Sequence, residues 1–218
     1  MIVGKGLIGK NCSSIDREDV LFFASGVSNS TCTDENEYER EIKLLEKYLN
    51  SDKKIIYFSS IDEYIINERY LTHKKKIEKI IESNTDNFII MKIPQLIGKN
   101  GNSKNFIFNI SENIKKNLSF DLYITKRSLL DVSDMVKILN HLLENNYKGF
   151  FNINYIELMD VSEIIKIVEN ILNKKSIINK SVLIDQKINK NCEFVESVIY
   201  KIIGDVSLYN LKVIKKYI

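Results

Sequence analysis

The sequence predicts an α/β fold with a Rossmann-like, doubly wound parallel sheet. Short apolar runs alternate with amphipathic helical patterns over the first two thirds of the chain, which is the signature of βαβ units. A complete G-x-G-x-x-G segment follows the first apolar run at residues 4–9. The 218 residues, of which 44% are hydrophobic, suffice for one large domain with a full core.

The predicted sheet elements alternate with helices. Each predicted helix places its apolar residues on one face and returns the chain for another parallel strand. The predicted strands are Met1–Val3, Val20–Ala24, Ile55–Phe58 and Phe88–Met91, and the predicted helices between the last three are Glu37–Leu49 and Glu68–Ser83.

The pattern changes after Pro94, where a polar loop begins with the segment GKNGNSKN. We expect one Rossmann-like domain over residues 1–218, with a small C-terminal substrate cap built mainly from 95–128 and 155–218. The pattern is weak beyond Ser176. Before that point, helices are predicted at Phe106–Ile114, Ser133–Leu143 and Val161–Leu172, and short strands at Ser128–Asp131 and Phe150–Asn154.

Composition excludes several classes of function. The 32 basic and 29 acidic residues give a net charge of only +3, so we expect no nucleic-acid partner. No apolar run reaches the length of a membrane span, and the first ten residues have no signal region, so we expect no membrane partner and a cytoplasmic location. Three dispersed cysteines and two histidines suggest neither a disulfide framework nor a metal site.

The glycine segment suits a turn between a strand and a helix. Gly4, Gly6 and Gly9 would permit a tight turn, a close approach of a pyrophosphate to the backbone, and close packing of helix on strand. A tight turn that binds no ligand would use the same residues. Ten residues separate Gly9 from Val20, which is too few for the strands that normally bind adenosine. We therefore predict that the sheet is shortened on its adenosine side and that Met1–Val3 lies at an edge.

A second cluster combines serine, tyrosine and lysine. The predicted third strand runs into Ser59 and Ser60, and Tyr70 and Lys74 are four residues apart on one helix face. An ammonium group beside a phenol favours the phenolate, so Lys74 would lower the pKa of Tyr70 and make it an acid/base group. His73 should face away from both and take no part.

These motifs resemble the extended short-chain dehydrogenase/reductase family, the NAD-dependent epimerases and dehydratases of nucleotide sugars. The chain resembles in particular the compact members found among bacterial surface-polysaccharide genes, which share the stretch ASGVSNS. The matching segments are GKGLIG at 4–9, FFASG at 22–26, YFSSIDEY at 57–64, YLTHK at 70–74, KIPQLIG at 92–98 and RSLLDVSD at 127–134.

The resemblance implies a set of site residues. The catalytic residues would be Ser60, Tyr70 and Lys74, and the substrate contacts would be Ser60, Asn105 and Arg127, with no metal ligand. The cofactor NAD or NADP would be bound by Gly4, Gly6, Leu7, Ile8, Gly9, Ser25, Gly26, Lys74 and Pro94.

The implied function is an NAD(P)-dependent nucleotide-sugar epimerase or 4-ketoreductase of surface polysaccharide biosynthesis, with a nucleotide sugar as substrate. A homodimer is compatible with the resemblance. Because the adenosine-side strands are absent, we expect the cofactor to bind weakly. Two alternatives stay open: a cofactor-free Rossmann-like binding or regulatory protein without catalysis, and an acid/base isomerase that uses Tyr70 without a nicotinamide.

Overall fold

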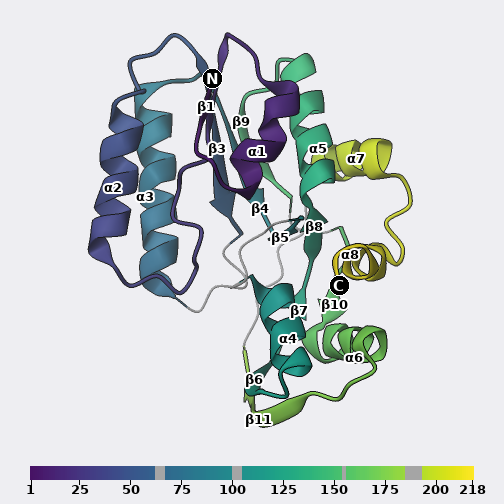
Figure 1. Cartoon of the computed structure of the whole chain (residues 1–218). Helices are drawn as coiled ribbons and strands as arrows, with labels where there is room; N and C mark the ends of the chain where they lie inside the picture. Colours follow the sequence, from purple (N-terminus) through teal and green to yellow (C-terminus); the bar gives the residue numbers. More distant parts are fainter. Residues whose placement is uncertain (62–66, 100–104, 154–155, 185–192) are drawn as a thin grey trace. The chain divides into compact units, whose positions relative to one another are not determined.

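The structure is a computed structural model that describes residues 1–61, 67–99, 105–153, 156–184 and 193–218 (Figure 1). The chain divides into two compact units. Unit 1 comprises Met1–Ile93 and Met135–Ile153, and unit 2 comprises Pro94–Asp134 and Asn154–Ile218. The two segments expected to supply cap elements, 95–128 and 155–218, both fall within unit 2.

Unit 1 contains a five-stranded sheet in the order β1-β2-β3-β4-β9, and every neighbouring pair is parallel. The fold class predicted from the sequence is therefore confirmed. In the described part of the chain no strand pairs with the outer side of β1, so the predicted edge position of the first strand is also confirmed. The strands are β1 (Ile2–Val3), β2 (Val20–Phe23), β3 (Lys54–Ser60), β4 (Phe88–Ile93) and β9 (Gly149–Asn152).

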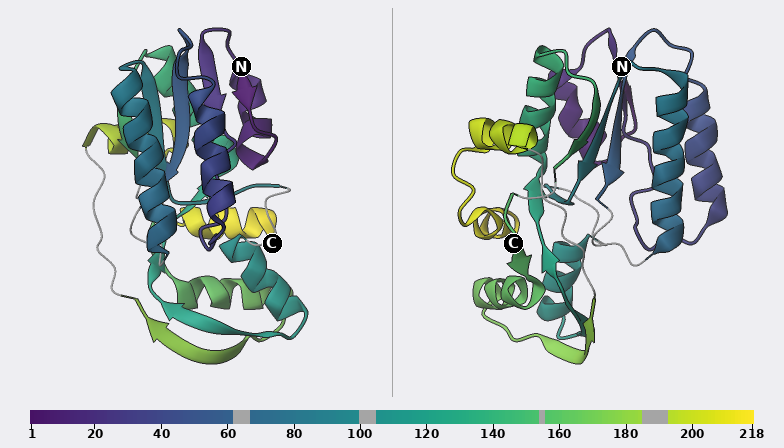
Figure 2. Two further views of the ribbon diagram at one scale, coloured as in Figure 1. Left: turned by 90° about the vertical axis from the view of Figure 1, so that its left-hand side faces the viewer. Right: turned by 180° about the vertical axis from the view of Figure 1, so that it is seen from behind.

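Helices cover both faces of this sheet. Figures 1 and 2 show α2 (Glu35–Glu46) and α3 (Glu68–Asn84) on one face, and α1 (Leu7–Cys12) and α5 (Val132–Glu144) on the other. A short 3-10 turn, η1 (Ser13–Ile15), follows α1. Side-chain caps define where α2 and α3 begin, because Asp34 and Asn67 accept hydrogen bonds from otherwise unpaired N–H groups of the first turn.

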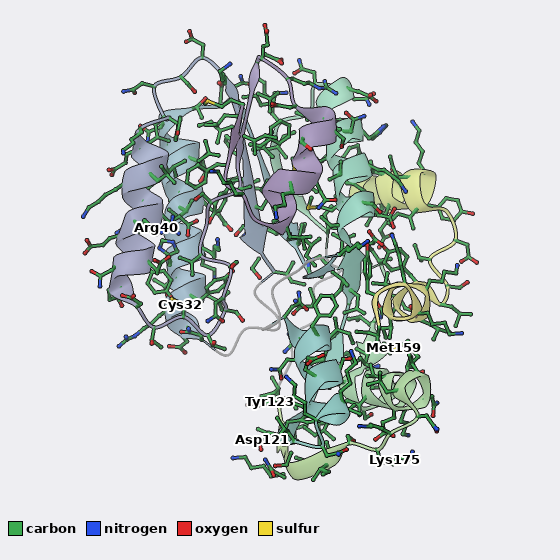
Figure 3. All side chains as sticks on the ribbon, in the orientation of Figure 1. Cys32, Arg40, Asp121, Tyr123, Met159 and Lys175 are labelled. Carbon is green, nitrogen blue, oxygen red and sulfur yellow. The ribbon has the colours of Figure 1, made fainter. Side chains whose placement is uncertain are left out.

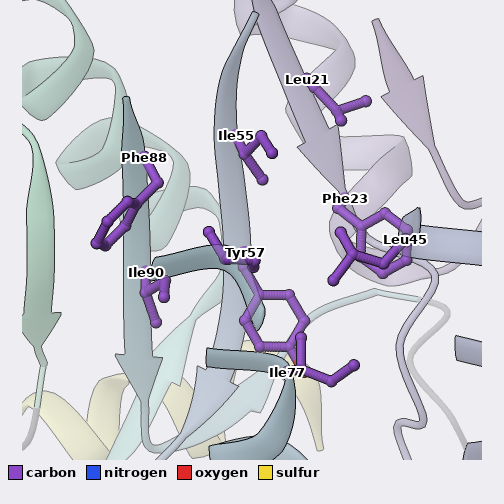
Figure 4. Packing of buried hydrophobic residues seen from close by; sticks show 9 residues of the cluster. Leu21, Phe23, Leu45, Ile55, Tyr57, Ile77, Phe88 and Ile90 are labelled. Carbon is purple, nitrogen blue, oxygen red and sulfur yellow. The ribbon is translucent and has the colours of Figure 1, made fainter. Parts of the chain in front are cut away.

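The core of unit 1 lies between the sheet and the α2–α3 layer (Figure 4). Tyr57 of β3 belongs to this core and is fully buried. Because side chains alternate along a strand, Ser59 faces the same layer as Tyr57, whereas Ser60 faces the opposite side of the sheet. The remaining members of the core are Leu21, Phe23, Leu45, Ile55, Ile77, Ile81, Phe88 and Ile90.

In its described residues, unit 2 contains three two-stranded sheets and four helices. One of these helices, α6, spans Val161–Leu172 as the sequence predicts. The weakly patterned region after Ser176 contains a strand and two helices that the sequence did not predict. The paired strands are β5 (Gln95–Ile97) with β8 (Leu129–Asp131), β6 (Ser119–Ile124) with β11 (Ile177–Leu183), and β7 (Lys126–Arg127) with β10 (Met159–Asp160). The helices are α4 (Phe106–Lys115), α6, α7 (Glu193–Ile203) and α8 (Tyr209–Tyr217).

None of the helices in the described ranges combines the length and the apolar character that crossing a membrane would need.

The turn after β1 leads to a first prediction about stability. Gly4 has φ +125°, and a Cβ atom there would lie 2.2 Å from the carbonyl oxygen of Ala24. Gly149, also in unit 1, has φ +103° but has no atom within 4 Å of a Cβ. Both alanine variants should suffer backbone strain, and only Gly4→Ala adds a backbone clash. We expect Gly4→Ala to lower the free energy of unfolding by about 2 kcal/mol more than Gly149→Ala.

Chemical denaturation of the two variants checks this prediction. Equal losses would mean that the turn after β1 is not packed as tightly as described.

Candidate functional site

The three glycines of the first turn have different roles. Gly4 and Gly9 are required by packing, since a Cβ on Gly9 would lie 2.3 Å from the carbonyl oxygen of Gly4. Gly6 differs, because it is exposed and a Cβ there would have no atom within 4 Å. Leu7 and Ile8 open α1, so their N–H groups belong to a first turn that lacks intrahelical partners. The backbone at Gly6 is therefore open to a ligand.

Two other predicted cofactor residues lie just beyond the end of β2. The carbonyl oxygen of Ser25 accepts hydrogen bonds of 3.2 Å from two guanidinium nitrogens of Arg40, which is labelled on α2 in Figure 3. A Cβ on Gly26 would lie 2.7 Å from Glu41 Oε1 and 2.9 Å from Lys74 Nζ. The pair formed by Glu41 and Lys74 is thus itself a reason for glycine at position 26.

Glu41 of α2 is the most completely bonded charged group in this region. Its side chain is 0% exposed. Oε1 accepts from the Tyr57 hydroxyl at 2.8 Å and from Lys74 Nζ at 3.4 Å, and Oε2 accepts from the Val27 N–H at 2.7 Å. His73 Nε2 lies 2.9 Å from Oε2. Donor groups from β3, from α3 and from the loop after β2 therefore converge on one carboxylate.

These partners keep Glu41 ionised. Burial would raise its pKa, but the hydrogen bond from His73, the charge of Lys74 and the bonds from Val27 and Tyr57 outweigh burial and hold the pKa at about 2. A carboxylate with this many donors is stabilised in its charged form.

The Lys74 ammonium is buried in the same cluster. Its Nζ donates to the Tyr57 hydroxyl at 2.9 Å and to Glu41, and it lies 5.6 Å from the centroid of the Tyr70 ring. Burial lowers the pKa of Lys74, and the Glu41 carboxylate opposes that shift. The phenol that is hydrogen-bonded to Lys74 is therefore Tyr57, which the sequence analysis did not select.

The pKa of Tyr70 moves in the direction opposite to the one expected. Burial raises it above its ordinary value, and the negative charge of Glu41 raises it further. The expectation that Lys74 lowers this pKa is therefore wrong for this structure, because burial disfavours the charged phenolate and the nearby Glu41 carboxylate disfavours it further. At neutral pH Tyr70 is a neutral phenol.

The two serines at the end of β3 lie in different surroundings. Ser59 is buried and its Oγ donates to Glu78 Oε1 of α3 at 2.5 Å. Ser60 is partly exposed, and its Oγ donates to the Ile61 carbonyl at 3.4 Å. The serine bonded to the helix that carries Tyr70 and Lys74 is therefore Ser59. Catalytic roles for Ser60, Tyr70 and Lys74 stay predictions.

His73 is not the bystander that the sequence analysis expected. It is 5% exposed, it contacts Glu41, and its ring packs against the Tyr38 ring with the centroids 4.6 Å apart and the planes tilted by 34°. The expectation was derived from the geometry of α3 alone. In the structure α2 packs beside α3, so a wider part of the α3 surface is buried and includes His73. The Tyr38 hydroxyl also fixes the segment before α2 by donating to the carbonyl of Cys32, which Figure 3 labels.

The sequence held a signal for Glu41 that the analysis missed. Tyr38, Glu41 and Leu45 are spaced as the buried stripe of an amphipathic helix, and all three are buried. A glutamate in such a stripe requires partners from neighbouring elements, because a buried charge is otherwise very costly.

The remaining predicted residues lie elsewhere. Pro94 is buried at the start of unit 2. Asn105 caps α4 by accepting from the Ile107 N–H, and its Nδ2 donates to the Leu96 carbonyl at 2.7 Å. The Arg127 guanidinium lies 5.5 Å from the centroid of the Phe106 ring. Residues 100–104 of the polar loop, and Tyr64 of the YFSSIDEY segment, are outside the described residues.

The ionisation of Glu41 leads to a prediction about acid stability. Its pKa is about 2 in the folded protein against an ordinary value of 4.5. A lowered folded-state pKa contributes stability that is fully present above pH 4.5 and is lost as the pH falls towards 2, and the shift is worth about 3 kcal/mol. Between these pH values, unfolding free energy should fall less steeply in Glu41→Gln than in the wild type.

Denaturant titrations at several pH values test this, with Glu39→Gln, an exposed residue of the same helix, as the control. The control should keep the wild-type pH slope. An unchanged slope in Glu41→Gln would contradict the four-donor description of Glu41.

Comparisons with known proteins support the fold. No protein-family model matches the sequence, and no similar curated protein was found.

The structure is similar to RMD from Pseudomonas aeruginosa complexed with NADPH, with a TM-score of 0.69 and 13% identity over 94% of this chain and 96% of that one. It is also similar to a UDP-N-acetylglucosamine 4-epimerase from Methanobrevibacter ruminantium in complex with UDP-N-acetylmuramic acid, with a TM-score of 0.59 and 16% identity over 93% and 80% of the two chains. A third is the UDP-glucose 4-epimerase of Thermus thermophilus complexed with NAD, with a TM-score of 0.61 and 13% identity over 90% and 80%. The chain therefore shares its fold with these three solved structures.

Proposed function

We propose that the protein is an NAD(P)-dependent enzyme acting on a nucleotide sugar, as an epimerase or a 4-ketoreductase of surface polysaccharide biosynthesis. The observation that carries the proposal is the open backbone at Gly6, in a strand-to-helix turn at the carboxyl end of a parallel sheet. Doubly wound folds bind their ligands at that end of the sheet. The complexes of similar fold with NAD, NADPH and a UDP sugar support the same chemistry.

The cofactor would be held mainly by backbone groups. Gly6, Leu7 and Ile8 would receive its pyrophosphate, because this turn is open and its N–H groups point out of the helix. Gly4 and Gly9 would shape the turn, and Ser25 and Gly26 would border the nicotinamide end. The cofactor contact of Pro94, in unit 2, stays a prediction. When bound, the nicotinamide supplies hydride transfer. Lys74 fits its proposed contact with the ribose less well, because its ammonium is already bonded to Glu41 and Tyr57.

We expect this binding to be weak. The sheet ends at β1, so no outer strand of the described chain brings an acidic residue to the adenosine ribose. Losing such a charge-assisted hydrogen bond costs about 1.5–3 kcal/mol, which corresponds to a tenfold to hundredfold loss of affinity. Lys5, which is exposed at the turn, and Lys10, which is exposed on α1, would be able to contact phosphate, whereas Arg17 is bonded to Asn140.

The neutral Tyr70 phenol favours the ketoreductase reaction over the epimerase reaction. Reduction of a 4-keto sugar turns the carbonyl oxygen into an alkoxide, which needs a proton donor. A phenol with a raised pKa holds its proton at neutral pH and can donate it, but it is a poor base for removing the proton of a sugar hydroxyl. Ser60 would hold the sugar oxygen. The substrate contacts of Asn105 and Arg127, in unit 2, stay predictions.

A cofactor-free binding or regulatory protein is the second candidate, and the bonded state of Lys74 favours it. If Lys74 serves only as the partner of Glu41, the Rossmann-like sheet is a scaffold without redox chemistry. Calorimetry with NAD(H) and NADP(H) separates the two candidates. Micromolar to millimolar binding supports the enzyme, and no binding at millimolar cofactor supports the second candidate.

The Gly6 position provides a variant for this measurement. A side chain at Gly6 meets no protein atom and its φ of −76° suits any residue, so Gly6→Asp should fold with unchanged stability. Its carboxylate would repel the pyrophosphate, and we expect cofactor affinity to fall at least about tenfold. The control Asn50→Asp adds the same charge at another exposed turn of unit 1 and should bind normally. Unchanged binding by Gly6→Asp would exclude the turn as the cofactor site.

Tyr70→Phe tests the proposed proton transfer. With a 4-keto nucleotide sugar and reduced cofactor, we expect kcat to fall about 100-fold, in the range of typical general acid contributions, with little change in cofactor affinity. Tyr48→Phe, a half-buried tyrosine of the same unit, should keep wild-type turnover. Full turnover by Tyr70→Phe would rule out acid catalysis by this residue.

A further inference from the structure

The Lys74 ammonium donates hydrogen bonds to two side chains of the protein itself. Its side chain is 5% exposed, and it lies between the Glu41 carboxylate and the Tyr57 hydroxyl, with the backbone of Gly26 directly beside it. Gly26 is one of the residues proposed to border the nicotinamide. Lys74 therefore has the position suited to a contact with the cofactor, but the Glu41 carboxylate draws it into the α2–α3 layer.

Nothing in the fold of α3 alone requires this arrangement. Glu78, one turn farther along α3, is also buried, and it pairs with Lys92 Nζ at 2.9 Å and with Ser59. The second buried carboxylate of this layer thus has its own cation, and Lys74 is the lysine that pairs with Glu41. The charge of Glu41 is satisfied by three further donors besides Lys74, so the carboxylate stays in place if Lys74 moves away.

We propose that Glu41 is an internal ligand of Lys74 that competes with the cofactor ribose for the ammonium. This inference rests on the proposed cofactor binding. Before the cofactor binds, Lys74 is bonded to Glu41 in most molecules. Only the molecules in which Lys74 has left Glu41 are ready to bond the cofactor ribose through this ammonium. Because an apparent dissociation constant rises by the inverse of the competent fraction, Glu41 weakens cofactor binding. Glu41 is thus a positioning residue that acts through Lys74.

The proposal predicts opposite effects on stability and affinity. Glu41→Gln keeps the shape of the side chain and an oxygen acceptor for Val27, but it leaves the Lys74 charge without its carboxylate, so the protein becomes less stable. Ribose hydroxyls can then bond the released ammonium. We expect the variant to bind NAD(H) about tenfold more tightly than the wild type. If the role of Glu41 were purely structural, the variant would instead lose both stability and affinity.

Calorimetry on the full chain, with NAD(H) and NADP(H) as the probes, measures this effect. Glu78→Gln is the matched control, since it removes a buried carboxylate of the same layer that pairs with Lys92. The control should lose stability and keep the wild-type affinity. Equal or weaker binding by Glu41→Gln, with measurable wild-type binding, would overturn the proposal.

A second readout examines Lys74 without any cofactor. Trace acetylation followed by peptide mapping should leave Lys74 protected in the wild type and label it in Glu41→Gln, with the exposed Lys76 as internal reference. If Lys74 is labelled only in the variant and neither protein binds cofactor, the proposed function fails, while the role of Glu41 as an internal ligand of Lys74 is supported. If Lys74 is equally protected in both proteins, this role of Glu41 is overturned, whether or not the proteins bind cofactor.

Discussion

The Glu41 carboxylate is a full negative charge in the interior of unit 1, and its burial constrains everything packed around it. A buried carboxylate is tolerated only when donors replace its water shell. Here the donors come from the loop after β2, from the middle of β3 and from α3. The charge thereby fixes the position of α2 and α3 against the sheet, and it favours glycine at position 26, where a Cβ atom would lie within 3 Å of both Glu41 Oε1 and Lys74 Nζ.

The same charge changes the chemistry of the Tyr70–Lys74 motif. An isolated ammonium would favour a phenolate, but Tyr70 is buried, and burial together with the negative charge of Glu41 raises its pKa instead. The region therefore suits proton donation better than proton removal. At the same carboxyl end of the sheet, β1 is an edge strand, which leaves the cofactor turn with few groups beyond its backbone. Both features favour weak cofactor binding.

The sequence predicted the parallel sheet well because buried strands and amphipathic helices have strong, local patterns. The five strands and the helices α2, α3 and α6 follow from such patterns, and the edge position of β1 follows from the short interval between Gly9 and Val20. The elements after Ser176 escaped prediction because their pattern was weak. In β11 this weakness has a physical basis, since most of its side chains are exposed and do not alternate between buried and exposed positions.

The contacts within the site could not be predicted in the same way. Glu41, Tyr57 and His73 lie 16 or more positions apart in the sequence and meet only through the packing of α2 on α3 and β3. Spacing along one helix correctly placed Tyr70 and Lys74 near each other, but it could not identify the carboxylate from another helix that neutralises Lys74. The buried glutamate within the apolar stripe of α2 was the one local sign of that partner.

A double-mutant cycle between Glu41 and Lys74 tests the central claim most directly. Unfolding free energies would be measured for the wild type, Glu41→Gln, Lys74→Met and the double variant. Because each single variant leaves a buried polar group without its partner, the account predicts that the double variant loses less stability than the two single losses combined, with a coupling of about 1–3 kcal/mol. Strictly additive losses would contradict the claim that these two charges stabilise one another in the folded protein.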